Sequence, residues 1–398
     1  MQEHYQGKKY EIIIVGAGIL GTFHAYHALQ LGMKVLLLEK NRRPRGASTQ
    51  NFGQVVPSGM NFKWQRLGRE SLRIYREIQQ QADISVCENG SVYFASNEEE
   101  VALLEELFQI NQANDYPSRL LTKSECLERF PGLKSKYCQA GLYFPQEVSL
   151  NPRVAVHRII QFLQEQHALD YLPDTLVVGM DTNDQGCQLV DSAGNTYFGE
   201  QVMVCNGSEF KSLFPDLFCK SDLEVVKLQM LQTAPQPTQR IPGNILTGLT
   251  IRRYESFREC PSYQTIKSKE DPRSFAKEYG IHILFKQAED GSVIIGDSHE
   301  YADVSNQDDL SSDLDNNINR YLMDAAMKIF DFQTWKIAKA WYGMYSQCKT
   351  SDIFRHTLDG KIHIVTGIGG KGMTASPAFA KENLYSILKR EEKIRNYG

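Results

Sequence analysis

The strongest constraint on the fold lies in residues 10–39. An isoleucine-rich apolar run over residues 10–15 leads into Gly16-Ala17-Gly18-Ile19-Leu20-Gly21, and apolar residues at helical spacing continue to residue 31. A second apolar run over residues 34–38 ends at Glu39. This order predicts a strand, a tight glycine turn, a helix and a second parallel strand, the βαβ unit of dinucleotide-binding folds.

The turn has the chemistry that a pyrophosphate requires. Gly16 permits the tight turn, Gly18 lets the backbone approach the phosphates, and Gly21 lets the helix pack against the strand. The free N–H groups and the dipole at the start of the helix attract negative charge. Glu39 follows Gly21 by 18 residues, where a carboxylate can accept hydrogen bonds from a ribose. The alternative is a structural βαβ unit with fortuitous glycines, which leaves the placement of the acid unexplained.

This first turn does not separate FAD from NAD. Arg42, Arg43 and Arg45 would suit the 2′-phosphate of NADP, but the charge of Glu39 argues against one, and a solvated basic turn also accounts for them.

A second glycine turn favours FAD. Gly367-Ile368-Gly369-Gly370-Lys371-Gly372 follows an expected strand over residues 361–366. Only 26 residues remain after it, too few for another dinucleotide domain. It is therefore expected to lead into a terminal helix whose positive end stabilises a reduced flavin. A plain strand-to-helix turn is the alternative.

The remaining patterns predict an α/β plus α+β chain. Helices are expected over residues 63–81, 98–111, 122–131, 151–166, 314–329 and 376–390, and strands over residues 90–95, 172–190, 196–204, 223–232, 282–286 and 292–296. We expect a Rossmann-like FAD-binding domain assembled from residues 1–85, 150–215 and 335–398. An antiparallel-sheet substrate domain, residues 86–149 and 216–334, is inserted into it.

Composition excludes several other classes of protein. A net charge of −4 over 398 residues offers no general field for nucleic acid or an anionic membrane. The eight cysteines include no C-x-x-C pair, and His24 and His27 lack a third ligand, so no metal site is expected. The polar residues 1–9 and the absence of a long apolar run predict a cytoplasmic protein without a membrane span.

Several segments resemble the D-amino acid oxidase and glycine/sarcosine oxidase (DAO) superfamily of FAD-dependent oxidoreductases. They are residues 12–39, 46–53, 202–207, 341–345 and 366–377. The resemblance implies that FAD is bound by a set of residues from these segments and two further positions, Lys40 and Val177: Gly16, Gly18, Ile19, Leu20, Gly21, Glu39, Lys40, Ala47, Ser48, Asn51, Phe52, Gly53, Val177, Asn206, Gly207, Gly343, Gly369, Gly370, Lys371, Gly372, Met373 and Thr374.

Three stretches are similar to one subgroup, which has been proposed to oxidise aminophosphonates related to 2-aminoethylphosphonate. They are Asn51-Phe52-Gly53, residues 296–301 and Gly372-Met373-Thr374.

Two departures from the family sharpen the expectation. Sarcosine-oxidase relatives carry a flavin-linked cysteine where Gly343 stands, so FAD is expected to be non-covalent; Cys348 is out of register and is interpreted as a buried or surface thiol. Amino-acid oxidases of the family often place a carboxylate-binding arginine where Tyr345 stands. A phosphonate or a simple amine fits better than an α-amino acid, with charge supplied by Lys371 or Lys349.

The resemblance implies hydride transfer from the α-carbon of a small amine to flavin N5, followed by hydrolysis of the imine. The catalytic candidates are His299, Tyr345 and Lys371; His299 and Tyr345 also have structural interpretations, a satisfied turn histidine and a packed tyrosine. Lys286 is interpreted mainly as a solvated strand lysine, with promotion of oxygen reactivity as the alternative. Oxygen or another acceptor reoxidises the flavin. Glycine, sarcosine or D-amino acid oxidation, an NAD-dependent dehydrogenase and a non-enzymatic nucleotide-binding protein remain alternatives.

Overall fold

The predicted βαβ unit opens the computed structural model, which describes residues 7–397 and the side chains up to residue 389. Strand β1 (Lys9–Val15) leads through the glycine turn into α1 (Ile19–Gln30), and β2 (Val35–Leu38) lies parallel to β1. Part of the predicted polar N-terminus, residues 1–6, lies outside the described residues.

The first sheet has eight strands drawn from distant parts of the chain. Its order is β18 (Phe354–Leu358), β19 (Ile362–Thr366), β11 (Thr196–Val204), β1, β2 and β8 (Asp170–Leu172), and β9 (Val177–Asn183) and β10 (Gly186–Asp191) extend from β11. The pairs β19–β11, β11–β1, β1–β2 and β2–β8 are parallel. Because these strands come from segments far apart in sequence, the expectation of a Rossmann-like domain built from separated segments is confirmed.

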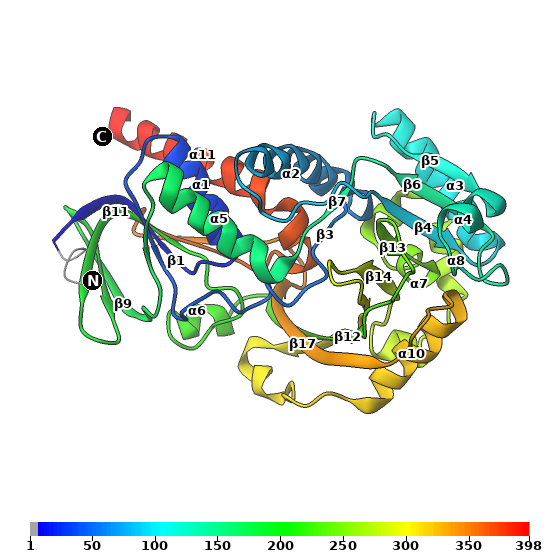
Figure 1. The fold of residues 1–398 in the computed structure, drawn as a ribbon. Helices are drawn as coiled ribbons and strands as arrows, with labels where there is room; N and C mark the ends of the chain where they lie inside the picture. Colours follow the sequence, from blue (N-terminus) through cyan, green and yellow to red (C-terminus); the bar gives the residue numbers. More distant parts are fainter. Residues whose placement is uncertain (1–6, 398) are drawn as a thin grey trace.

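Helices cover this sheet on the side of α1. Figure 1 shows α1, α5 (Pro152–His167) and α11 (Gly372–Tyr397) grouped beside β1 and β11, with α2 (Phe62–Gln81) next to α11. Contacts of α1 with α5 and α11, and of α11 with α2, hold this layer together. The apolar side chains of α1, β2, α5 and α11 share one core cluster.

The second sheet is mixed and mostly antiparallel. It runs β16 (Glu300–Asp303), β12 (Leu223–Thr233), β15 (Val293–Gly296), β14 (Leu284–Gln287), β13 (Asn244–Leu246), β4 (Ser91–Ala95), β6 (Ala140–Phe144) and β5 (Arg119–Thr122). The long strand β17 (Ile337–Cys348) pairs with β12 along its whole length. This pairing brings residues that the predicted boundaries assign to the first domain into the second sheet. The division into two domains itself stays a prediction.

Capping residues in the sequence mark the start of several helices, but the start of α11 differs from the expected one. Helix α4 (Lys123–Arg129) begins with a capping box between Thr122 and Glu125, and Asn151 caps α5. The closing helix was expected from residue 376 but begins at Gly372, so four more residues are helical. The last glycine of the turn is therefore already the first residue of α11.

Two further helices border the second sheet. Helix α3 (Glu98–Ala113) contacts β4, β5 and β6, and α10 (Asn316–Ile329) contacts β12 and β15. Shorter helical segments between β13 and β14 include α7 (Gly248–Ile251) and the 3-10 segment η3 (Glu255–Glu259). Within the described chain, no helix combines the length and the apolar character that crossing a bilayer requires.

Candidate functional site

One large cavity receives residues from both sheets. Its volume is about 920 Å³, near the upper end of the roughly 300–1,000 Å³ common for small-molecule sites. The first glycine turn, most of residues 45–53 and the start of α11 line it, as do residues at the start of β14 and residues that follow α7 and β15. A single cavity of this size has room for a dinucleotide and a small second molecule.

Hydrogen bonds hold the first glycine turn in place. The backbone N–H of Ala17 donates to Oε2 of Glu39 at 3.0 Å, and that of Ile19 donates to Oγ of Ser48 at 2.8 Å. Oε1 of Glu39 accepts from the backbone N–H and the side-chain amide of Asn41, both at 3.0 Å. A methyl group at Gly21 would lie 2.0 Å from the carbonyl oxygen of Gly16, so this close packing requires glycine.

The predicted FAD-binding residues gather around this cavity with two exceptions. Gly21 packs against the turn instead of lining the cavity. Gly343, on β17, backs onto residue 50, where an added Cβ would lie 2.8 Å from the carbonyl oxygen of Gln50. All the other predicted positions line the cavity. Their contact with the cofactor stays a prediction.

The cavity wall fits a phosphate-bearing and hydroxyl-bearing cofactor. Oδ1 of Asn206 is buried without a hydrogen-bond partner among the described residues, and Asn206 lines the cavity. Asn51 organises the neighbouring loop: its side chain donates to the carbonyl of Ala47 at 2.7 Å and accepts from the N–H of Gly53 at 2.6 Å. Arg42 and Arg43 are exposed, as a solvated basic turn predicts.

The second glycine turn places the start of α11 at the cavity. Gly369 and Gly370 lie in a short 3-10 segment immediately before Gly372, and all three line the cavity. A Cβ at Gly370 would meet nothing within 4 Å, so this face is open. The free N–H groups at the start of a helix as long as α11 form an anion-stabilising end. Lys371 lies beside it, and its Nζ is 3.5 Å from Oε1 of Glu255 and 5.3 Å from the ring centre of Trp64.

His299 and Tyr345 lie in the part of the cavity formed by the second sheet. His299 follows β15, and its Nδ1 lies 3.0 Å from the carbonyl oxygen of Gly280. Its ring centre is 6.4 Å from that of Tyr345 on β17. Burial raises the pKa of Tyr345 and lowers that of His299 to about 3, so both side chains are uncharged near neutral pH.

Sequence reasoning missed the arginine of this region. Arg253 lines the cavity, and one of its guanidinium nitrogens donates to Oη of Tyr301 at 2.8 Å. Burial alone would lower the pKa of Arg253, but Tyr301, Tyr345 and Asp297 hold it above its ordinary value. The guanidinium is therefore charged, and it makes no ion pair with the carboxylates of the described chain.

The neighbouring Arg252 has a different role. Its guanidinium pairs with Glu100 at 2.9 Å and with Glu99 at 3.0 Å, and Glu100 is buried. Arg258, like Arg253, lines the cavity and forms no ion pair within residues 7–389. The sequence alone offers no signal that separates Arg253 from Arg252, because the separation depends on which carboxylates the fold brings near each one.

One sequence-based interpretation, that of Lys286, needs correction. Lys286 is buried on β14, not solvated, and its Nζ donates to the carbonyls of Phe52 and Leu150. Burial lowers the pKa of Lys286 to about 7. Cys348 lines the cavity, and burial raises the pKa of its thiol to about 11, so the thiol is protonated near neutral pH.

Three other predicted side chains have partners outside the proposed chemistry. Lys349 lines the cavity but pairs with Asp303. His24 and His27 are buried helix-packing residues that contact the carbonyls of Leu20 and Pro377, each through one ring nitrogen. The fold brings a different group of potential metal ligands together, namely His282, Asp297 and His299.

Comparisons with known proteins agree with this geometry. Residues 11–383 match the model of the family described as DAO, FAD dependent oxidoreductase. Monomeric sarcosine oxidase of Streptomyces avermitilis is 24% identical over 211 residues, covering 52% of this chain and 54% of that protein. Human mitochondrial sarcosine dehydrogenase is 24% identical over 147 residues, covering 35% of this chain and 16% of that protein. The matched regions therefore span 54% and 16% of the lengths of these two relatives.

A solved structure shares the fold over nearly the whole chain. Glycine oxidase from Geobacillus kaustophilus superposes with a TM-score of 0.75 at 16% sequence identity, and the match covers 96% of this chain and 95% of that one.

Proposed function

The chain belongs to the DAO family of FAD-dependent oxidoreductases, and we propose that it oxidises a small amine that carries a phosphonate group. Family membership decides between the two cofactors that the first glycine turn left open, and it removes the NAD-dependent dehydrogenase as an alternative. FAD supplies the acceptor for a hydride from the carbon that bears the amine. The protein supplies binding, orientation and charge.

FAD binding is proposed for the residues that line the first part of the cavity. The glycine turn at Gly18 and the start of α1 face the pyrophosphate, and Glu39 accepts from the ribose while it holds Ala17. The start of α11, at Gly372, faces the flavin and stabilises the negative charge that reduction adds. Lys371 adds a positive charge at the same place, since Glu255 and Trp64 hold it near the cavity.

The observation that carries the substrate proposal is a guanidinium group in this cavity that has no ion pair with the described residues. An unpaired, partly buried Arg253 is a binding group for an anion, and its planar fork suits two oxygens of one phosphonate or carboxylate. Arg258 supplies a second unpaired positive charge at the cavity. Two such charges match a phosphonate, which carries up to two negative charges, better than a carboxylate, which carries one.

The remaining polar groups orient the amine. Tyr345 stays protonated, so its hydroxyl can donate to a phosphonate oxygen or accept from the amine. His299 is neutral and has one ring nitrogen held by the carbonyl of Gly280, so its other nitrogen can accept from the amine.

A panel of substrates tests this proposal. The purified flavoprotein is mixed anaerobically with 2-aminoethylphosphonate, its 1-hydroxy and N-methyl forms, glycine, sarcosine and D-alanine, and bleaching of the flavin absorption is followed by stopped flow. We expect at least one phosphonate to reduce the flavin with a higher second-order rate constant than any carboxylate. A faster reaction with glycine, sarcosine or D-alanine would favour an amino-acid oxidase or dehydrogenase instead. The absence of bleaching by every amine would reject amine oxidation itself.

A further inference from the structure

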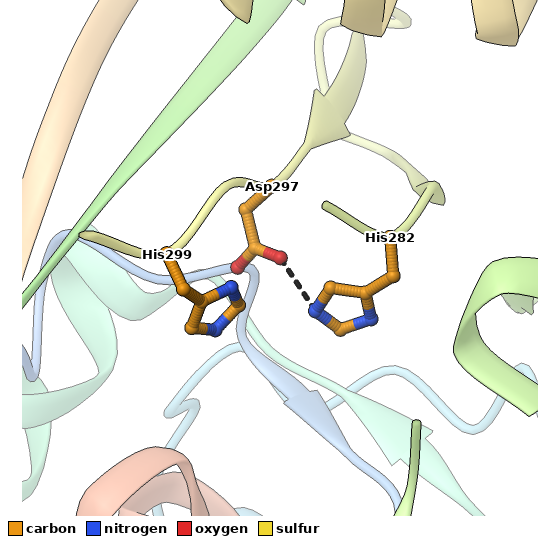
Figure 2. Close-up of side chains that lie close together, drawn as sticks. All are labelled: His282, Asp297 and His299. Atoms are coloured by element: carbon orange, nitrogen blue, oxygen red, sulfur yellow. Dashed lines mark ion pairs between the residues drawn. The ribbon is translucent and has the colours of Figure 1, made fainter. Parts of the chain in front are cut away.

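The side chains of His282, Asp297 and His299 meet at the cavity wall. His282 precedes β14, whereas Asp297 and His299 follow β15, the strand that pairs antiparallel with β14. The pairing of Leu284 with Gly296 brings the two segments together. One ligand atom from each side chain lies within 4.8 Å of the others. Figure 2 shows the carboxylate of Asp297 between the two imidazole rings.

The group is buried, yet it faces the cavity. Relative exposures are 4% for His282 and 6% each for Asp297 and His299, and all three line the cavity wall. Nε2 of His282 lies 2.7 Å from Oδ1 of Asp297, the ion pair drawn in Figure 2. Oδ1 of Asp297 has this contact alone, and Nδ1 of His282 is a buried polar atom without a hydrogen-bond partner in the described structure. Buried atoms of this kind call for a partner.

The charges show what kind of partner is missing. Burial would raise the pKa of Asp297, but His282, His299 and Arg253 hold it below its ordinary value, so the side chain is a carboxylate. His299 is neutral, and because a carbonyl only accepts, its Nδ1 hydrogen goes to Gly280 and its Nε2 keeps a lone pair. The group therefore offers the carboxylate of Asp297 and the acceptor Nε2 of His299, which fit a small cation that donates several hydrogen bonds.

We propose that His282, Asp297 and His299 form the amine subsite, where the Asp297 carboxylate pairs with the substrate ammonium and unoccupied imidazole nitrogens accept its other N–H bonds. This inference rests on the proposed function and names the residues that select the amine. Arg253 lies close enough to influence Asp297 electrostatically, but the two side chains form no ion pair in the described chain. The amine subsite and Arg253 together complement a zwitterion, with the ammonium on one and the phosphonate on the other.

The amine subsite also accounts for the proton released by the reaction. Oxidation of R–CH2–NH3+ to R–CH=NH2+ breaks one C–H bond and one N–H bond. The hydride, with its electron pair, goes to FAD. The proton goes to the subsite, to the carboxylate or to a free imidazole nitrogen, and from there to solvent. Water then hydrolyses the iminium to the aldehyde and ammonium.

A divalent metal ion is the competing occupant of these atoms. Two imidazoles and one carboxylate are a ligand set for zinc or ferrous iron. The nearby charge of Arg253 disfavours a doubly charged ion more than a singly charged ammonium. The substrate ammonium, by contrast, is part of the same molecule as the phosphonate that Arg253 is proposed to bind. The charges around the subsite therefore favour the amine over a metal ion.

A pair of isosteric ligands tests the amine subsite without turnover. 2-Amino-2-methylpropylphosphonate has no hydrogen on the carbon that bears nitrogen, so it cannot be oxidised, and 2,2-dimethylpropylphosphonate replaces its ammonium by a methyl group. Dissociation constants are measured from the perturbation of the flavin spectrum in the holoenzyme. We expect the ammonium ligand to bind roughly 30-fold more tightly or better, the effect of a desolvated charge pair. In Asp297→Asn the two ligands should bind within about threefold of each other.

Controls separate the possible failures. Asp308→Asn removes an exposed carboxylate that pairs with Lys211, and it should keep the wild-type preference. If Asp297→Asn does not fold, His299→Gln replaces it and should also weaken the preference. An unchanged preference in both variants, or equal binding of the two ligands to wild type, would overturn the amine subsite. So would one equivalent of zinc or iron that is found by mass spectrometry in wild type and lost in Asp297→Asn. If neither ligand perturbs the flavin, the phosphonate substrate is overturned instead.

Discussion

Replacing Arg253 tests the anion site with a magnitude that follows from its surroundings. In the described structure its guanidinium has one hydrogen bond, to Tyr301, and no carboxylate partner, so Arg253→Met leaves no carboxylate unpaired. The substrate loses two charge-assisted hydrogen bonds worth about 1.5–3 kcal/mol each, or about 3–6 kcal/mol together. The dissociation constant for 2,2-dimethylpropylphosphonate should then rise by roughly two to four orders of magnitude. Arg253→Lys keeps the charge without the planar fork and should fall in between.

The assay is the same spectral titration of the holoenzyme, combined with thermal unfolding. Arg273→Met is the matched control, because that side chain is 92% exposed and pairs only weakly with Asp271. Arg252→Met should behave in the opposite way: it leaves the buried Glu100 without its partner, so it should lower the melting temperature far more than Arg253→Met does. The reasoning is refuted if Arg253→Met folds, retains FAD and binds the phosphonate within threefold of wild type.

Three further predictions concern the cofactor and the core. Gly21→Ala would place a methyl group 2.0 Å from the carbonyl of Gly16 and should yield protein depleted in FAD. Gly179→Ala, on β9 away from the cavity and with nothing within 4 Å of an added Cβ, should keep its flavin; equal flavin content would contradict this. Acid precipitation should leave FAD in the supernatant, since glycine occupies position 343; flavin on the pellet would point to Cys348, and Cys348→Ser would test that. Burial raises the pKa of Glu147 from 4.5 to about 7. Between these pH values the folded protein keeps the Glu147 proton that the unfolded chain has lost. The free energy of unfolding should therefore fall by up to about 3 kcal/mol as the pH rises from 4.5 to 7. Glu147→Gln should remove that loss in melts between pH 5 and 8; an unchanged pH dependence would show that Glu147 is not its source.

The sequence predicted the first part of the site well because its signals are local. A glycine turn, a helix start and an acid within 30 residues fix one another through backbone geometry, and Ala17, Glu39 and Ser48 are hydrogen-bonded as that geometry requires. The second turn was also recognised, although the start of its helix was misplaced because Gly372 and the next residues were read as loop.

The substrate side could not be predicted in the same way. His282 and Asp297 are 15 residues apart, and only the antiparallel register of β14 and β15 makes them neighbours. Lys286 lies on β14, a strand of the second sheet. Its burial follows from contact with the loop at Phe52, which is distant in the sequence. Side chains assembled by long-range strand pairing leave no periodic signal in a single sequence.

A single-turnover experiment tests the central claim most directly. The purified flavoprotein is mixed anaerobically with a limiting amount of 2-aminoethylphosphonate, and flavin reduction, aldehyde and ammonium are measured in the same sample. The proposed function predicts one equivalent of aldehyde and one of ammonium for each flavin reduced by two electrons. Flavin that stays oxidised, or that is reduced without release of the aldehyde, would contradict it.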